Sequence, residues 1–175
     1  MEFQKSVIEL IKMRTSSRSF DQNNIESETL KKLKDYIKKS NEETKLRARV
    51  IVVQSNDDSS KAKKLGTYGV ISGAKSFIIA IFEKDEKDAL EFGYLFEKII
   101  LFATDLGLQT CWLGGTFNKG NFEENMSLVD NEFIPIVSPV GIKKEKPRVF
   151  ESVMRKVIGA NKRKDRKSTR LNSSH

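Results

Sequence analysis

The chain has 175 residues, enough for one ordinary domain with a sizeable core, and 38% of them are hydrophobic, which favours a folded globule over a disordered chain. The formal charge of +8 suggests nucleic-acid binding, but residues 162–170 hold six Lys/Arg and one Asp, and the rest of the chain mixes both signs. No apolar run is long enough to span a bilayer, and we expect a cytoplasmic protein without a membrane partner.

The hydrophobic spacing predicts two helices and then two strands in the first half of the chain. They are expected over residues 3–13, 28–39, 48–55 and 76–83. Four apolar residues share one face of the first helix: Phe3, Val7, Leu10 and Ile11. Ser27 is a good N-cap for the second helix.

The longest predicted helix runs from Glu86 to Leu106 and ends at Gly107, because glycine suits the left-handed conformation that follows a last turn. Between Phe92 and Ala103 it is apolar on nearly every face, which indicates burial on most sides, in a core or at an interface. A short strand running into a glycine pair, a helix and a last strand are then expected over residues 108–115, 121–129 and 133–141.

The counts of histidine and cysteine narrow the possible chemistry. His175 is the only histidine and Cys111 the only cysteine. A CxxC metal clip and an intrachain disulfide are therefore excluded, and a Ser-His-Asp triad, a Cys-His pair or a zinc site is disfavoured. Cys111 lies in an apolar strand, which favours a core residue over a reactive thiol. An enzyme of this composition would use a bound organic cofactor, or carboxylates and lysines.

Residues 13–20, MRTSSRSF, place two arginines four positions apart with hydroxyl side chains between them. After a helix we expect a turn or an extended segment, in which Arg14, Ser16 and Arg18 can face the same way. Guanidinium groups bind phosphate oxygens through paired donors, and hydroxyl groups can donate further bonds. A surface turn whose arginines cap helix carbonyls is the alternative, and the spacing alone favours it.

Two other segments are rich in glycine. Gly114 and Gly115 follow an aromatic-rich strand and would let the backbone approach a flat group closely, because no Cβ intervenes; a tight turn is the alternative. The segment GTYGVISG, which begins at Gly66, matches neither the dinucleotide-binding pattern nor the P-loop pattern. We expect it to be mobile or closely packed.

Three segments, in this order, resemble the nitroreductase family of FMN-dependent oxidoreductases. IKMRTSSRSF is similar to the family's Arg-x-Ser-x-Arg-x-aromatic entry motif. EFGYLFEKIILFATDLGLQTCWLGG is similar to its long central helix, the following strand and the Gly-Gly that meets the flavin, and IPIVSPVGIKKEKPR to the next strand and turn. The resemblance covers about residues 3–164 and implies a three-layer, nitroreductase-like α/β (α+β) fold.

The resemblance also implies which residues bind FMN: Arg14, Thr15, Ser16, Arg18, Gly114, Gly115 and Arg163. The first four would hold the phosphate and ribityl chain, the glycines would lie against the isoalloxazine ring, and the last arginine would return to the phosphate. Such an enzyme oxidises NAD(P)H and passes electrons by a ping-pong mechanism to a nitroaromatic, quinone-like or related small acceptor. It needs no catalytic side chain and no metal, since the flavin carries the chemistry.

The segment after the second predicted helix departs from the family pattern. Most members have a Pro-Ser-x-x-Asn-x-Gln-Pro-Trp-like segment there, which reaches the partner subunit's flavin, whereas this chain has KSNEETKLRARVIVV. The departure resembles a longer branch, typified by a Thermotoga nitroreductase, in which a second half of the same chain supplies that segment. Residues 1–164 would then be the incomplete first half of a pseudo-dimeric chain, and a homodimer could replace the missing half. Residues 165–175 would be a non-native, disordered tail.

Two other functions stay open on the sequence alone. A non-catalytic flavin-binding module would bind FMN without being reduced by NADH. A basic nucleic-acid-binding protein would show a steep salt dependence and would need residues 162–175. We expect no nucleic-acid partner, because the excess charge is concentrated in that tail.

Overall fold

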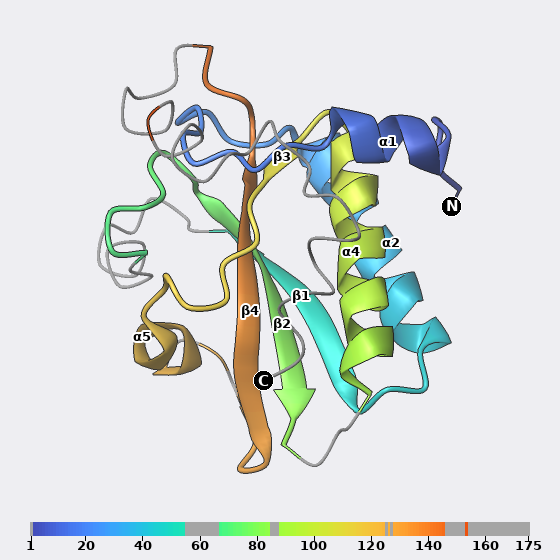
Figure 1. The fold of residues 1–175 in the computed structure, drawn as a ribbon, viewed down its shortest axis with the longest axis vertical. Coiled ribbons are helices and arrows are strands. Elements are labelled where there is room, and N and C mark those ends of the chain that lie inside the picture. The colour runs from blue at the N-terminus through green and yellow to red at the C-terminus, as the bar shows by residue number, and fades with distance from the viewer. Residues whose placement is uncertain are drawn as a thin grey trace, which may run out of the picture. The chain divides into compact units, whose positions relative to one another are not determined.

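The computed structural model describes residues 2–54, 67–84, 88–124, 126, 128–145 and 153, and Met1–Glu145 form one compact unit. Its helices are α1 (Val7–Met13), α2 (Ser27–Glu43), α4 (Ala89–Asp105) and α5 (Lys119–Glu124), and its strands are β1 (Ala48–Gln54), β2 (Ser76–Glu83), β3 (Gln109–Thr110) and β4 (Glu132–Gly141) (Figure 1). This order of helices and strands agrees with the sequence prediction. Arg163 and the predicted tail, residues 165–175, lie outside the described residues.

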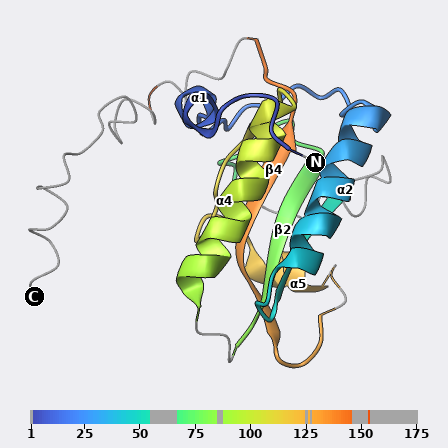
Figure 2. The ribbon, with the colours of Figure 1, turned by 90° about the vertical axis from the view of Figure 1, so that its right-hand side faces the viewer.

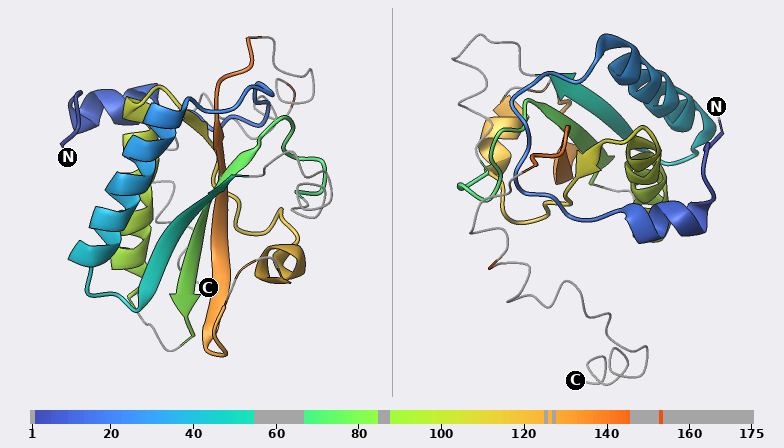
Figure 3. Two further views of the ribbon diagram at one scale, coloured as in Figure 1. Left: turned by 180° about the vertical axis from the view of Figure 1, so that it is seen from behind. Right: turned by 90° about the horizontal axis from the view of Figure 1, so that it is seen from above.

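The four strands form one antiparallel sheet in the order β1-β2-β4-β3, so β1 and β3 are its edge strands. Side chains of β2 alternate between two buried clusters: Ile78 and Ala80 pack with α2 and α4, while Phe77 and Ile79 pack with the segment that contains α5. Figures 2 and 3 show α2 and α4 on one face of the sheet and α5 on the other. The predicted three-layer α/β (α+β) fold is confirmed.

Helix α4 is buried on most sides, as predicted. Phe96, Ile99 and Ile100 are fully buried against the sheet and α2, and Phe102 stacks on Tyr36 of α2 with ring centroids 3.7 Å apart. Burial raises the pKa of Tyr36 to about 12, because the deprotonated phenol would lose its hydration. Tyr94 is an exception, with 71% of its surface exposed.

The ends of α4 follow from their capping groups. The Asp88 side chain accepts a hydrogen bond from the backbone N–H of Glu91 at 2.8 Å, so the helix begins at Ala89. At the other end Gly107 has φ +79°, the left-handed conformation that the sequence predicted. The predicted start at Glu86 falls on residues 85–87, which lie outside the described residues.

Helix α1 is shorter than predicted and buries less. It begins at Val7 because Ser6 and Glu9 form a capping box. Leu10 is its only buried residue, whereas Val7 and Ile11 are about half exposed. The predicted apolar face is therefore present, but Leu10 is the only residue of the helix that it buries in the core.

Two further helix boundaries differ from the prediction. Helix α2 begins at Ser27 itself, with Glu26 in the N-cap position and no side-chain cap, and it extends to Glu43. Helix α5 begins at Lys119 because the side chain of Asn118 accepts a hydrogen bond from the N–H of Asn121 at 3.2 Å. It ends at Glu124, well before the predicted end.

Strand β3 is short because its neighbour in β4 is a proline. Gln109 and Thr110 pair with β4, and the next register position faces Pro139, which has no N–H to donate. The N–H of Cys111 instead donates to Ser138 Oγ at 3.1 Å. The two strands pair again only at Leu113, and the chain then leaves the sheet edge towards the glycine pair.

Candidate functional site

We name residues 14–21 the strap, because they cross from α1 along the outer edge of β3. Ser16 pairs with Thr110 in a parallel bridge, and the N–H of Ser17 donates to the carbonyl of Thr110 at 2.9 Å. The hydroxyl of Ser17 donates to Gln109 Oε1 at 2.8 Å. The first half of the strap therefore acts as an additional edge segment beside β3 (Figure 1).

The second half of the strap is held by the loop before β2. The N–H of Phe20 donates to Ser72 O at 2.8 Å, and the N–H of Ser72 donates to Arg18 O at 2.9 Å. Gly73, with φ +80°, lies so close that a Cβ there would stand 2.1 Å from Phe20 O. This glycine belongs to the segment that was expected to be mobile or closely packed, and it is closely packed; Gly66 lies outside the described residues.

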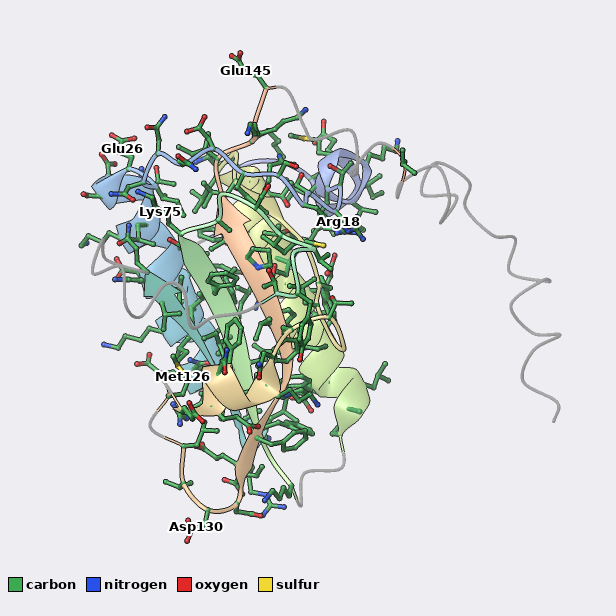
Figure 4. All side chains as sticks on the ribbon, turned by 90° about the vertical axis from the view of Figure 1, so that its left-hand side faces the viewer. Arg18, Glu26, Lys75, Met126, Asp130 and Glu145 are labelled. Carbon is green, nitrogen blue, oxygen red and sulfur yellow. The ribbon has the colours of Figure 1, made fainter. Side chains whose placement is uncertain are left out.

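Burial alternates from Ser16 to Ser19, as expected for extended chain, and Phe20 is buried as well. Ser17 and Ser19 are buried, at 7% and 3% exposed, while Ser16 and Arg18 are half-buried. Ser16 and Arg18 are therefore less buried than Ser17 and Ser19, although Nε and Nη1 of Arg18 are themselves buried. Figure 4 labels Arg18 on the same side of the view as α1, away from Lys75.

Arg14 and Thr15 occupy the start of the strap. Arg14 is the C-cap residue of α1 and donates its N–H to Leu10 O at 2.8 Å, so its backbone is fixed by the helix end. Its Nε lies 3.3 Å from Glu97 Oε1 on α4, an ion pair between two partly exposed side chains. Thr15 is exposed.

Gly114 and Gly115 lie beyond β3 and are exposed. Neither has a positive φ, and a Cβ at either position would meet nothing within 4 Å. Neither the backbone conformation nor packing among the described residues therefore requires glycine here. The space over the pair is open enough to receive a flat group, which is the arrangement expected for a ring lying against the backbone.

The strap and the glycine pair are connected through one strand. Ser16 pairs with Thr110, and Gly114 follows four residues later, so Thr110 and Gly114 lie at most ~13 Å apart along extended chain. A phosphorylated, ring-bearing ligand can span such a separation. The sequence predicted both parts, and the fold brings them to the same edge of the sheet.

Between the two parts, the protein leaves hydrogen-bonding capacity unused. Among the described residues, Thr110 Oγ1 and Trp112 Nε1 are buried and have no hydrogen-bond partner. Such atoms cost free energy unless another group satisfies them. Both are sealed from solvent here, so a ligand would reach them only after a local shift of this stretch.

Sequence reasoning missed one charged residue of this region, Glu97. Its position in the sequence could have identified it, since Glu97 and Lys98 are the only charged residues in the apolar stretch between Phe92 and Ala103. Lys98 lies 3.8 Å from Glu43 of α2, whereas Glu97 contacts the strap. Within the part of the chain that the structure describes, no helix is long and apolar enough to cross a membrane.

Comparison with known proteins gives one family and many similar structures. The family model described as "Putative TM nitroreductase" matches residues 6–173. A nitroreductase family protein from Clostridium difficile is 22% identical, over 94% of this chain and 96% of that chain, with a TM-score of 0.66. No curated protein matches the chain.

Two further solved structures share the fold. A nitroreductase family protein from Clostridium novyi is 24% identical, over 83% of this chain and 87% of that chain, with a TM-score of 0.62. A mutant of an FMN- and NADPH-dependent nitroreductase from Sphingopyxis is 10% identical, over 82% of this chain and 90% of that chain, with a TM-score of 0.63.

Proposed function

Because this chain belongs to the nitroreductase family described by the model that matches residues 6–173, we propose that it is an FMN-dependent oxidoreductase that takes electrons from NAD(P)H. Similar structures include an oxidoreductase containing FMN and an FMN- and NADPH-dependent nitroreductase, which supports this cofactor. The observation that carries the proposal is that the strap pairs with β3 at Thr110 and that the glycine pair follows β3 four residues later, at the same edge of the sheet.

The residues of this edge fit the parts of FMN. Arg14, Ser16 and Arg18 would hold the phosphate and the ribityl chain, with a further contact from Thr15, because guanidinium and hydroxyl donors suit phosphate oxygens. Gly114 and Gly115 would lie against the ring, where a side chain would intrude. We retain Arg163 as a proposed phosphate ligand on the family resemblance.

When bound, FMN supplies the chemistry by accepting a hydride from NAD(P)H and passing electrons, in a ping-pong sequence, to a small nitroaromatic or quinone-like acceptor. The role of the chain is to bind and orient. The two strap arginines offset the phosphate charge, and the backbone of the glycine pair fixes the ring position and can donate N–H groups to it. The open side of the glycine pair would leave room for the second substrate.

A second copy of the chain would complete the site in this proposal. Six apolar side chains of α1 and α4 are between 45% and 87% exposed: Val7, Ile8, Ile11, Met13, Leu90 and Tyr94. Exposed apolar groups on two helices that pack together indicate an interaction surface. A homodimer would cover them, and the pseudo-dimeric arrangement inferred from the sequence would do so with a second half of the same chain.

The first test is flavin retention by the full chain. We expect protein mixed with FMN and passed through gel filtration to elute as a dimer with a visible flavin band, which NADH bleaches under nitrogen and air restores. A band that NADH does not bleach would favour the flavin-binding module instead. A colourless protein would contradict the proposal.

Arg14→Ala tests the phosphate end directly. We expect it to weaken FMN binding at least about tenfold, which corresponds to about 1.4 kcal/mol, and to leave riboflavin, which has no phosphate, nearly unaffected. Arg47→Ala is the matched control, since Arg47 also pairs with a glutamate, Glu83, at 3.4 Å but lies on the segment before β1. Equal losses in both variants would contradict the assignment of Arg14.

A further inference from the structure

Glu97 places a carboxylate at the phosphate end of the proposed site. Its Oε1 lies 3.3 Å from Arg14 Nε, with the side chains 36% and 27% exposed. Phe96 and Ile99 on either side of the Glu97–Lys98 pair are fully buried, and Lys98 pairs with Glu43 of α2, so Glu97 is the one acid of this apolar stretch of α4. A carboxylate beside an arginine that must bind phosphate competes with the phosphate for the same charge.

We propose that the Glu97 carboxylate forms an ion pair with the Arg14 guanidinium while the site is empty, and that this pair breaks when a phosphate group binds Arg14. This inference rests on the proposed function. The contact supports an exchange, because a single Nε–Oε1 approach of 3.3 Å is longer than the usual charge-assisted hydrogen bond. A guanidinium has five N–H donors, and this contact engages one edge. A phosphate monoester carries more negative charge than a carboxylate and can bind two donors at once.

The exchange would have two consequences of opposite sign. In the empty protein, Glu97 offsets the positive charge of Arg14, which lies four residues from Arg18, and so stabilises the fold. In the loaded protein, the same carboxylate repels the nearby phosphate and lowers affinity. Glu97 would thus reduce the affinity of the site for phosphate-bearing ligands. A residue that merely positioned Arg14 would raise that affinity.

The test compares Glu97→Gln with the wild type in the full chain. Glu83→Gln is the matched control, because Glu83 pairs with Arg47 at 3.4 Å and is 34% exposed, close to the geometry and exposure of Glu97. Flavin fluorescence titration gives the affinities for FMN and riboflavin, and thermal unfolding without ligand gives the stability of the empty protein.

We expect Glu97→Gln to bind FMN about twofold to fivefold more tightly, within the range that a partly exposed ion pair can contribute, with riboflavin affinity unchanged and a lower melting temperature for the empty protein. Glu83→Gln should bind FMN like the wild type. Unchanged FMN affinity in Glu97→Gln would overturn the inference, and so would weaker FMN binding, which would make Glu97 a positioning residue.

Failure of the proposed function has a separate signature. If the wild type binds neither flavin, the flavin proposal fails, and inorganic phosphate then tests the exchange by itself. A larger rise of melting temperature with phosphate in Glu97→Gln than in the wild type would support the exchange. An equal or smaller rise would overturn it.

Discussion

The two edge strands of the sheet are completed in different ways. On β1, the side-chain amide of Asn41 in α2 accepts a hydrogen bond from the N–H of Val50 at 2.9 Å and donates one to its carbonyl at 2.7 Å. One side chain therefore replaces a neighbouring strand at that position. On β3, the backbone of the strap lies along the edge, with the N–H of Ser17 bonded to the carbonyl of Thr110.

This difference suggests that the β1 edge has a structural role, whereas the β3 edge carries the proposed site. Asn41 satisfies the β1 edge with an uncharged side chain and adds no chemistry, which fits a role in blocking contacts with other strands. The backbone of the strap satisfies the β3 edge, so the side chains of Arg14, Ser16 and Arg18 are not needed to complete that edge. The edge then ends at Gly114, where nothing in the described residues fills the space.

The largest expected effect comes from detaching the strap through Gly73→Ala. Its φ is +80°, and the new Cβ would stand 2.1 Å from the backbone oxygen of Phe20, so the strap must shift. We expect a loss of about 3 kcal/mol of unfolding free energy, measured by denaturant titration, together with loss of FMN retention.

Gly69→Ala is the control for that change. Gly69 also has a positive φ, +73°, but a Cβ there would meet nothing within 4 Å. Gly69→Ala should lower the unfolding free energy by only about 1 kcal/mol, the effect of a non-glycine residue in a left-handed backbone conformation, and leave FMN retention intact. Equal losses from both glycine variants would show that contact with the strap is not what constrains Gly73.

A smaller effect is expected from Asn41→Ala on the opposite edge. Val50 is fully buried, and the change removes the partner of its N–H and its carbonyl. We expect a loss of about 2 kcal/mol in unfolding free energy with FMN affinity unchanged, whereas Asn23→Ala, at an exposed asparagine, should change neither. Loss of FMN affinity at full stability would contradict the division between the two edges.

Much of the fold follows from local sequence pattern. Consecutive apolar residues such as Phe77, Ile78 and Ile79 indicate a strand buried on both faces at β2, and the apolar run from Phe92 indicates a buried helix at α4. The strap was predictable for the same reason, since MRTSSRSF after a helix end gives extended chain with alternate side chains on one side.

Pairings between distant segments could not be predicted from local pattern. Nothing near Asn41 in the sequence indicates that its side chain will complete β1, and nothing near Glu97 indicates Arg14, because each contact depends on how α2 and α4 pack. Gly69 and Gly73 look alike in sequence, yet of these two only Gly73 would place an added Cβ against the strap. The apolar face of α1 was visible, but its pattern does not say whether the core or another molecule covers it.

The smallest expected effect on stability comes from Gly114→Ala. Because the fold should be unaffected, any loss of ligand binding in this variant can be assigned to the site at the β3 edge. The φ of Gly114 is not positive and its Cβ would meet nothing within 4 Å, so the unfolding free energy should change by less than about 0.5 kcal/mol. A methyl group over the ring position should nonetheless weaken both FMN and riboflavin binding about tenfold, because both carry the ring. The phosphate-end variant Arg14→Ala should affect FMN alone. If Gly114→Ala leaves both affinities unchanged, the ring lies elsewhere, and the open space beside the glycine pair serves another purpose.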